Sequence, residues 1–348
     1  MNVVTQFTIE NKVKYPIIMA PMFLVSNLPM MKAAIDSGIM GAFPTLNYRV
    51  ENELSTILAE LNSYNSNGKS GNYGVNLIVQ KSNLLYTKHL NICVEAKVPF
   101  YITSLGSPAE VIEKAHSYGG KVYCDVTNIA HAQKCYSLNC DGFIAVGQGA
   151  GGHAGPNPLH ILVTSLQKHF PDKPVIAAGG IANGSGILSM LALGAAGVSI
   201  GTRFIATTES TVNDGYKNAI VESKMEDIVL TEKISGTPCT IINTPFAKKI
   251  GYKQNWFEKL LSKNSTTRKY FKMLVQFRGM QKLTASVQPG NYKTLWCAGQ
   301  SVELIDEIKP VSEIVAKMIN EYDQAFLSLQ KLTPRITNEY EKPIGITQ

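Results

Sequence analysis

Eight short apolar segments alternate with amphipathic segments between residue 16 and about residue 204. Several are almost entirely apolar, such as those beginning at Pro16 (PIIMA) and Pro174 (PVIAA). Continuous apolar runs are typical of parallel strands covered on both faces. The alternation therefore predicts an α/β fold, a (β/α)8 TIM barrel. A doubly wound open sheet is the alternative, which the strand count disfavours. We expect strands at residues 16–22, 41–47, 73–79, 100–105, 121–127, 142–146, 174–178 and 197–204.

Amphipathic patterns between these segments predict the barrel helices. The alternation then stops, and residues 207–298 are more polar, contain Pro238, Pro245 and Pro289, and hold both tryptophans. We expect the barrel to comprise residues 1–206 and 299–348, with 207–298 as an inserted cap over its mouth. Residues 301–329 are expected to return as one or two helices, followed by a loosely packed tail from Thr333. The other helices are expected at residues 51–64, 84–96, 108–118, 129–138, 159–169 and 184–193.

Composition limits the function classes. The chain has 348 residues, of which 45% are hydrophobic and 17% charged, as in soluble globular enzymes. The net charge of +7 is dispersed and no nucleic-acid recognition motif accompanies it, so no nucleic acid is expected as a partner. No apolar run is long enough for a membrane span and no signal peptide is evident, which predicts a cytoplasmic protein without membrane contact. The six cysteines have neither CxxC nor zinc spacing, so we expect free thiols and no metal.

The carboxyl ends of barrel strands carry function, and four of them, those of the first, third, seventh and eighth strands, have unusual residues here. The first strand ends in Ala20, Pro21 and Met22, where proline stiffens the turn and a small side chain lets a flat ring approach the backbone. The third strand contains Asn76 among apolar neighbours. A buried amide needs hydrogen-bond partners, so Asn76 binds either a ligand or a neighbouring loop.

Glycines mark the ends of the seventh and eighth strands. Gly179 and Gly180 follow the seventh, and Gly201 and Thr202 lie in the last part of the eighth. Barrel phosphate sites form at these two ends, where backbone N–H groups converge and a helix N-terminus adds favourable potential. The alternative is that these glycines only make tight turns.

A glycine-rich loop with one histidine follows the sixth strand. Gly151, Gly152 and His153 lie in it, and we call residues 147–155 the histidine loop. Glycine lets a backbone come close to a ligand, and histidine accepts a proton near neutral pH. The alternative is a mobile turn with a solvated histidine. Combined with the phosphate and ring contacts, the loop predicts a site for flavin mononucleotide (FMN), with His153 near the reactive face of the ring.

These motifs resemble the nitronate monooxygenase family of flavin-dependent barrels, formerly called 2-nitropropane dioxygenases. The resemblance covers about residues 15–305 and includes the segment at 296–300 (WCAGQ). It implies noncovalent FMN, with His153 as catalytic base. Val146 and Gly149 depart from the family pattern, which often has Gln and Glu at these places. The flavin contacts that it implies include Asn76, Gly151, Gly180, Gly201 and Thr202.

The predicted function is oxidation of alkyl nitronates, and of nitroalkanes, by oxygen to a carbonyl compound and nitrite. Flavin-dependent enoyl-acyl-carrier-protein reductases share the histidine loop, so an NAD(P)H-dependent reductase of enoyl thioesters or quinones is the first alternative. A non-catalytic barrel that binds a phosphorylated metabolite is the second. A homodimer is left open. The roles of Asp125, Arg203, Tyr292 and Lys293 are also left open.

Overall fold

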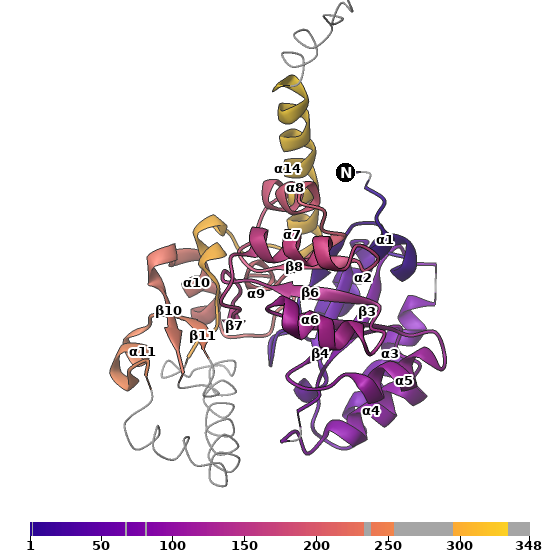
Figure 1. Cartoon of the computed structure of the whole chain (residues 1–348). Coiled ribbons are helices and arrows are strands. Elements are labelled where there is room, and N and C mark those ends of the chain that lie inside the picture. Colours follow the sequence, from indigo (N-terminus) through magenta and orange to yellow (C-terminus); the bar gives the residue numbers. More distant parts are fainter. Residues whose placement is uncertain (2, 67, 81, 233–237, 254–294, 333–348) are drawn as a thin grey trace, which may run out of the picture.

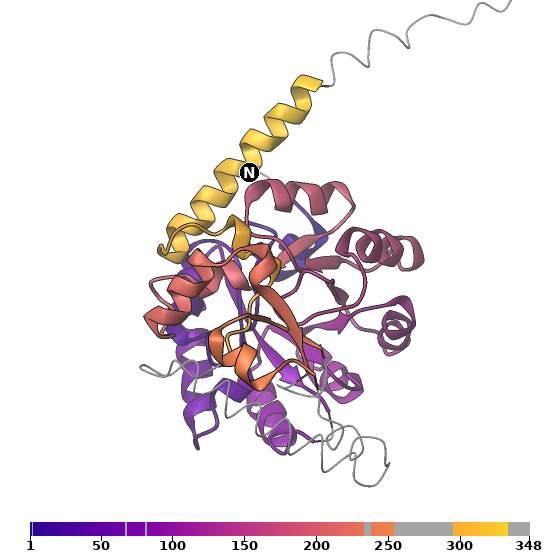
Figure 2. The same cartoon turned by 90° about the vertical axis from the view of Figure 1, so that its left-hand side faces the viewer.

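The computed structural model describes residues 1, 3–66, 68–80, 82–232, 238–253 and 295–332. Eight parallel strands close into a barrel in the order β1-β2-β3-β4-β5-β6-β8-β9, with helices arranged around it (Figures 1 and 2). This confirms the predicted TIM barrel. The strands are β1 (Ile17–Met19), β2 (Met40–Pro44), β3 (Asn72–Ile78), β4 (Phe100–Ser104), β5 (Lys121–Val126), β6 (Gly142–Val146), β8 (Val175–Ala178) and β9 (Gly197–Ile200).

Three predicted strands are too long. The first ends at Met19 and the second at Pro44, each three residues early, and the difference is largest for the eighth strand. It ends at Ile200, and the four residues of α9 (Thr202–Ile205) follow it. Phe204 and Ile205 are buried in this short helix. An apolar run is compatible with a buried strand or a buried helix, so the sequence pattern did not locate the change at Gly201.

The six predicted barrel helices are present, and two N-terminal helices were not predicted. One of these, α2, begins after Asn27, whose side-chain oxygen accepts a hydrogen bond from the Met30 amide at 2.9 Å. The helices around the barrel are α1 (Gln6–Asn11), α2 (Leu28–Asp36), α3 (Glu53–Asn65), α4 (Tyr86–Glu95), α5 (Ala109–His116), α6 (Ile129–Tyr136), α7 (Leu159–His169) and α8 (Gly184–Ala192).

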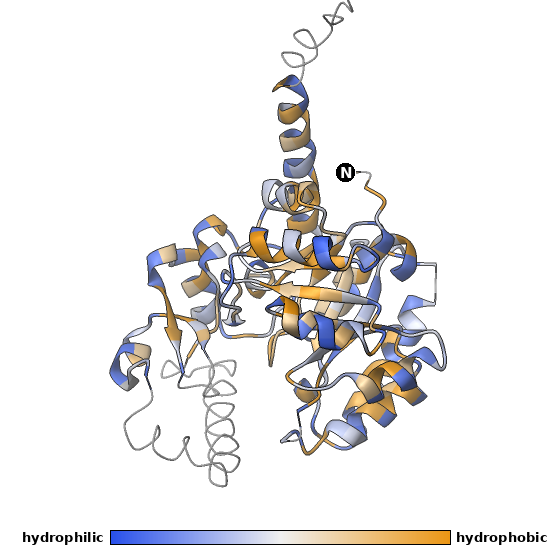
Figure 3. Ribbon diagram, in the orientation of Figure 1, coloured by the Kyte–Doolittle hydropathy of each residue, from blue (hydrophilic) through white to orange (hydrophobic). Residues whose placement is uncertain are grey.

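Two apolar cores hold the barrel together. One lies between the strands and the surrounding helices, and the other fills the barrel interior. The strands accordingly carry much of the hydrophobic colour in Figure 3. Helix α1 closes the amino-terminal end of the barrel, because Phe7 enters the inner core and its ring lies 6.0 Å from that of Phe100 and 6.1 Å from that of Tyr123.

A small antiparallel sheet lies beside the barrel. It has the order β10-β11-β7 and joins β10 (Ile228–Thr231) and β11 (Cys239–Ile242) to β7 (Gly152–His153) of the histidine loop. It forms one side of the molecule with α10 (Asp214–Glu222) and α11 (Pro245–Ile250) (Figure 1). Residues 254–294 of the predicted cap lie outside the described residues.

The last predicted helical region consists of a 3-10 turn (Gln300–Leu304) and one long helix, α14 (Val311–Leu332). Helix α14 packs against α8 and α2 and then extends beyond the body of the barrel (Figure 2). The predicted tail from Thr333 lies outside the described residues. Among the helices that are described, none has the length and apolar character needed to cross a membrane.

We predict that Phe7→Ala lowers the free energy of unfolding by about 3–5 kcal/mol, because it leaves a cavity in the inner core. Chemical denaturation measures this change. The matched control is Ile9→Ala on the same helix, since Ile9 is 67% exposed and its truncation should change stability little. Equal effects of the two substitutions would contradict the closing role of α1.

Candidate functional site

The ends of β1 and β9 meet at the mouth of the barrel. The Ala20 amide donates to the Ile200 carbonyl at 2.9 Å. A Cβ placed on Gly201 would lie 3.6 Å from the Ala20 Cβ and 3.8 Å from the Met22 sulfur. The structure therefore brings Ala20, Met22 and Gly201 together, as the sequence predicted, with Pro21 in the intervening turn. The Met22 amide donates to the Ser26 hydroxyl at 2.9 Å, which fixes that turn.

The end of β8 lies directly against the histidine loop. Gly179 and Gly180 have φ angles of +127° and +73°, which side-chain-bearing residues rarely adopt. A Cβ on Gly179 would lie 2.8 Å from the Ala150 nitrogen, and one on Gly149 would lie 3.0 Å from the Gly180 nitrogen. Glycine is required on both sides because the two backbones touch.

Gly151 makes a second close backbone contact. A Cβ there would lie 2.8 Å from the Gly299 nitrogen and 2.9 Å from the Thr202 hydroxyl. The Gly299 amide donates to that hydroxyl at 3.0 Å, which joins the segment before α14 to α9. Gly151 therefore has a packing role in the structure, and its predicted contact with a flavin stays a prediction. Gly152 differs, because a Cβ there would meet nothing within 4 Å.

The N-terminus of α8 is already occupied by side chains. The Gly186 amide donates to Asn183 at 2.8 Å, and the Gly184 amide donates to the Glu321 carboxylate at 2.9 Å. The predicted contribution of this helix terminus to phosphate binding is therefore reduced. A phosphate at this end would rely on the backbone near Gly180 and Gly201.

Strand β11 fixes the backbone position of His153. Its backbone pairs with Cys239 of β11, and the neighbouring Thr240 hydroxyl donates to the Ala150 carbonyl at 2.7 Å. His153 has exposed surface as a residue, and protein atoms around its imidazole lower its pKa by partial desolvation. A lowered pKa favours the neutral imidazole at pH 7, which is the form that accepts a proton.

A chain of polar side chains crosses β3, β4 and β5 near the mouth. The Asn76 amide donates to the Ile102 carbonyl at 3.1 Å and to the Ser104 hydroxyl at 2.7 Å. The Ser104 hydroxyl in turn donates to the Asp125 carboxylate at 2.5 Å. Both amide protons of Asn76 are thus used within the sheet. Among the described residues no hydrogen bond to its side-chain oxygen is found, so that oxygen is left to accept one, and binding of a ligand by Asn76 stays a prediction.

Asp125, whose role the sequence left undecided, lies at the end of this chain of polar side chains. Burial raises its pKa to about 6, although the bond from Ser104 favours the charged form. No cation forms an ion pair with it among the described residues, and an unpaired carboxylate is costly even at this half-buried position. Perturbed carboxyls of this kind occur at functional sites. Tyr123 two residues earlier belongs to the inner core, so strand alternation indicates the inward direction of Asp125.

Two other residues left open by the sequence are outside this cluster. Arg203 is buried, and its guanidinium donates to the Glu307 carbonyl at 3.1 Å and the Ala206 carbonyl at 3.4 Å. It therefore holds the chain that leads to α14. Tyr292 and Lys293 lie outside the described residues.

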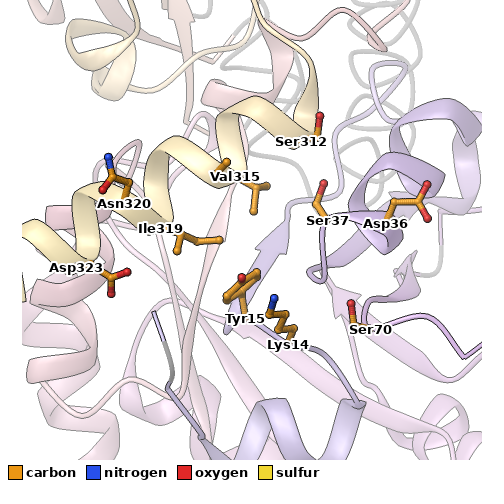
Figure 4. Close-up of a pocket in the computed structure, with 11 residues that line it drawn as sticks. Lys14, Tyr15, Asp36, Ser37, Ser70, Ser312, Val315, Ile319, Asn320 and Asp323 are labelled. Atoms are coloured by element: carbon orange, nitrogen blue, oxygen red, sulfur yellow. The ribbon is translucent and has the colours of Figure 1, made fainter.

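A groove of about 440 Å³ lies at the other end of the barrel, between α14 and the chain around α2 (Figure 4). Its lining includes Lys14 and Tyr15, which precede β1, together with Asp36 and Asp323. None of the predicted site residues lines it, so the groove is separate from the mouth.

Comparison with known proteins now decides the family. The nitronate monooxygenase family model matches residues 47–321, which include the polar chain, the histidine loop and the ends of β8 and β9. The chain belongs to the nitronate monooxygenase family. It is accordingly a flavin oxidoreductase of that family, as the sequence predicted.

Its relatives in this family carry several activities. The chain is 29% identical to a probable nitronate monooxygenase of Staphylococcus saprophyticus, over 92% of this chain and 99% of that protein. It is 26% identical to (3aS,4S,5R,7aS)-5-hydroxy-7a-methyl-1-oxo-octahydro-1H-indene-4-carboxyl-CoA dehydrogenase of Rhodococcus jostii, over 87% and 91% of the two chains. The structure of FabK from Thermotoga maritima has a TM-score of 0.80 and 29% identity, covering 95% of this chain and 99% of that one.

We predict that Asp125→Asn stabilises the protein without cofactor at pH 7.5 by up to about 3 kcal/mol. The pKa of Asp125 is raised in the folded protein to about 6 from 3.8. Ionisation of Asp125 therefore destabilises the folded protein, so that its contribution to the free energy of unfolding is complete below pH 3.8 and is lost as the pH rises through 6. Asparagine keeps an acceptor for Ser104 and removes the charge. Urea unfolding at pH 5 and pH 7.5 measures the effect, and a variant that is less stable than the wild type at pH 7.5 contradicts the assignment.

Proposed function

We propose that this protein is an FMN-dependent enzyme that oxidises alkyl nitronates, and neutral nitroalkanes, with oxygen to give a carbonyl compound and nitrite. The observation that carries the proposal is the fixed position of the histidine loop. Its backbone is packed against Gly179, Gly180 and Gly299, and its histidine is held by pairing with β11. The family match supports the same reaction class.

The residues at the mouth fit a flavin nucleotide. Ala20 and Gly201 are small and lie beside the Met22 side chain, and this apolar wall suits a flat ring. Backbone amides around Gly180 and Gly201, with the Thr202 hydroxyl, suit a phosphate. Asn76 and Asp125 offer oxygen acceptors from the sheet to polar ring atoms. When bound, the flavin supplies the electron transfer with substrate and oxygen.

The protein's own part in the proposed reaction is proton transfer and orientation. A nitroalkane is acidic at the carbon that bears the nitro group. In the neutral form favoured by its lowered pKa, the His153 imidazole removes that proton and leaves the nitronate. A substrate supplied as the nitronate needs no such step, so His153 then only orients it.

We predict that His153→Ala lowers turnover of a neutral nitroalkane by about 10²–10⁴ and lowers turnover of the preformed nitronate much less. Steady-state oxygen consumption with the two substrates measures this difference. His160→Ala is a suitable control, because His160 is an exposed residue at the start of α7. Wild-type turnover of the neutral nitroalkane by His153→Ala would remove His153 from the role of base.

Reduction of an enoyl thioester or quinone by NAD(P)H is the second candidate. It is favoured by the extent of the similarity to FabK and by a relative that is named as a CoA dehydrogenase. Both candidates use the same barrel and the same histidine loop. The family match favours an enzyme over a non-catalytic phosphometabolite-binding barrel.

An anaerobic titration separates the two reactions. The protein is loaded with FMN, mixed with an alkyl nitronate or with NADH, and followed by visible absorbance. The proposed function predicts bleaching of the flavin by the nitronate and slow or no bleaching by NADH. Rapid bleaching by NADH with no response to the nitronate supports the reductase instead. The expected cytoplasmic location and a homodimer stay predictions from the sequence.

A further inference from the structure

Two cysteines lie side by side at the border of the histidine loop. Cys239 is in β11, and Cys297 precedes the Gly299 contact described above. Their sulfur atoms are 3.8 Å apart. Neither residue belongs to the predicted flavin site, and neither has a part in the proposed proton transfer.

The backbone register explains why the two thiols meet. Cys239 pairs with His153, and two residues further along β11 Ile241 pairs with Cys297. The histidine loop and residues 296–298 therefore run in succession along one edge of β11. The Trp296 carbonyl accepts from the Ile242 amide at 2.8 Å, which fixes the second part of this edge.

The surroundings of the two sulfurs differ. Cys239 is 1% exposed, whereas Cys297 is partly exposed. The neighbouring Cys297 thiol and burial raise the pKa of Cys239, which keeps it protonated. An oxidant from solvent therefore reaches Cys297 first and finds Cys239 as the adjacent second thiol.

We propose that Cys239 and Cys297 form a redox-active pair, which a hydroperoxide oxidises to a disulfide that ties β11 to the segment before α14. A disulfide needs its sulfurs about 2.05 Å apart, so they must approach by about 1.8 Å. Rotation of the two cysteine side chains, with a small backbone adjustment at Cys297, supplies this movement.

The chemistry is balanced with one molecule of hydrogen peroxide. The Cys297 thiol loses its proton to solvent, and the resulting thiolate attacks one peroxide oxygen. The O–O bond breaks, the leaving hydroxide takes a proton back from solvent and departs as the first water, and Cys297 becomes a sulfenic acid. The sulfur of Cys239 then attacks the sulfur of Cys297, the S–O bond breaks, and a second water leaves. Two thiols are thereby oxidised by two electrons while the peroxide is reduced to two waters.

The new bond would constrain the histidine loop from two sides. Thr240, next to Cys239, holds the Ala150 carbonyl, and Gly299, two residues after Cys297, packs on Gly151. Joining the two segments covalently should therefore reduce backbone motion at residues 149–153. This consequence does not depend on which substrate the enzyme uses.

The test treats the purified full-length protein with a modest excess of hydrogen peroxide, followed by trypsin digestion and mass spectrometry without reduction. Cys239 lies in the tryptic peptide 234–248 and Cys297 in 294–317, because trypsin does not cleave between Lys309 and Pro310. We expect these peptides to be linked, two hydrogen atoms lighter than their sum, and separated by dithiothreitol. Amide hydrogen exchange at residues 149–153 should slow on oxidation and recover on reduction.

Cys297→Ser provides the matched control, since it changes one partly exposed atom and should keep the fold, as checked by circular dichroism. It should give no linked peptide and no peroxide-dependent change in exchange. Absence of the link in the wild type while Cys297 is oxidised to sulfinic acid would overturn the proposal. A link that leaves exchange at residues 149–153 unchanged would overturn its connection to the histidine loop.

Discussion

The close backbone contact of the histidine loop with the end of β8 and with Gly299 is the constraint on which the mouth of this barrel depends. Three chain segments approach so closely that any Cβ at Gly149, Gly151 or Gly179 would meet a backbone atom at 3.0 Å or less. The contact joins the sixth and seventh barrel strands to the segment that leads into α14. It thereby fixes the backbone position of His153 relative to the ends of the barrel strands.

The small sheet formed by β10, β11 and β7 completes this arrangement. The histidine loop supplies only two residues to the small sheet, and β11 supplies the longer strand against which they align. A histidine on an isolated glycine-rich loop would sample many positions. Pairing with Cys239 and the bond from Thr240 remove much of this freedom. The barrel therefore supplies the proposed binding surface, and β11 restricts the backbone position of the proposed base, His153.

The sequence predicted the barrel and the place of its eight strands, because buried parallel strands have a simple apolar signature, but it extended the first, second and eighth strands beyond their observed ends. It predicted less about the use of each polar and small residue. Gly151 lies in a glycine-rich loop of the kind that often contacts a ligand. Its nearest neighbours are nevertheless Gly299 and Thr202, which are distant in the sequence. Asp125 could be placed only through the register that sets Ser104 beside it. Contacts between distant segments determine these roles, and local patterns do not contain them.

A structure of the protein with FMN bound tests the central claim most directly, namely that the glycine contacts form one wall of a flavin site. We expect the FMN phosphate at the backbone around Gly180 and Gly201 and the flavin ring against Ala20 to Met22. The imidazole of His153 should be directed toward the ring. A flavin bound away from the ends of β8 and β9, or an imidazole directed away from the ring, would contradict it.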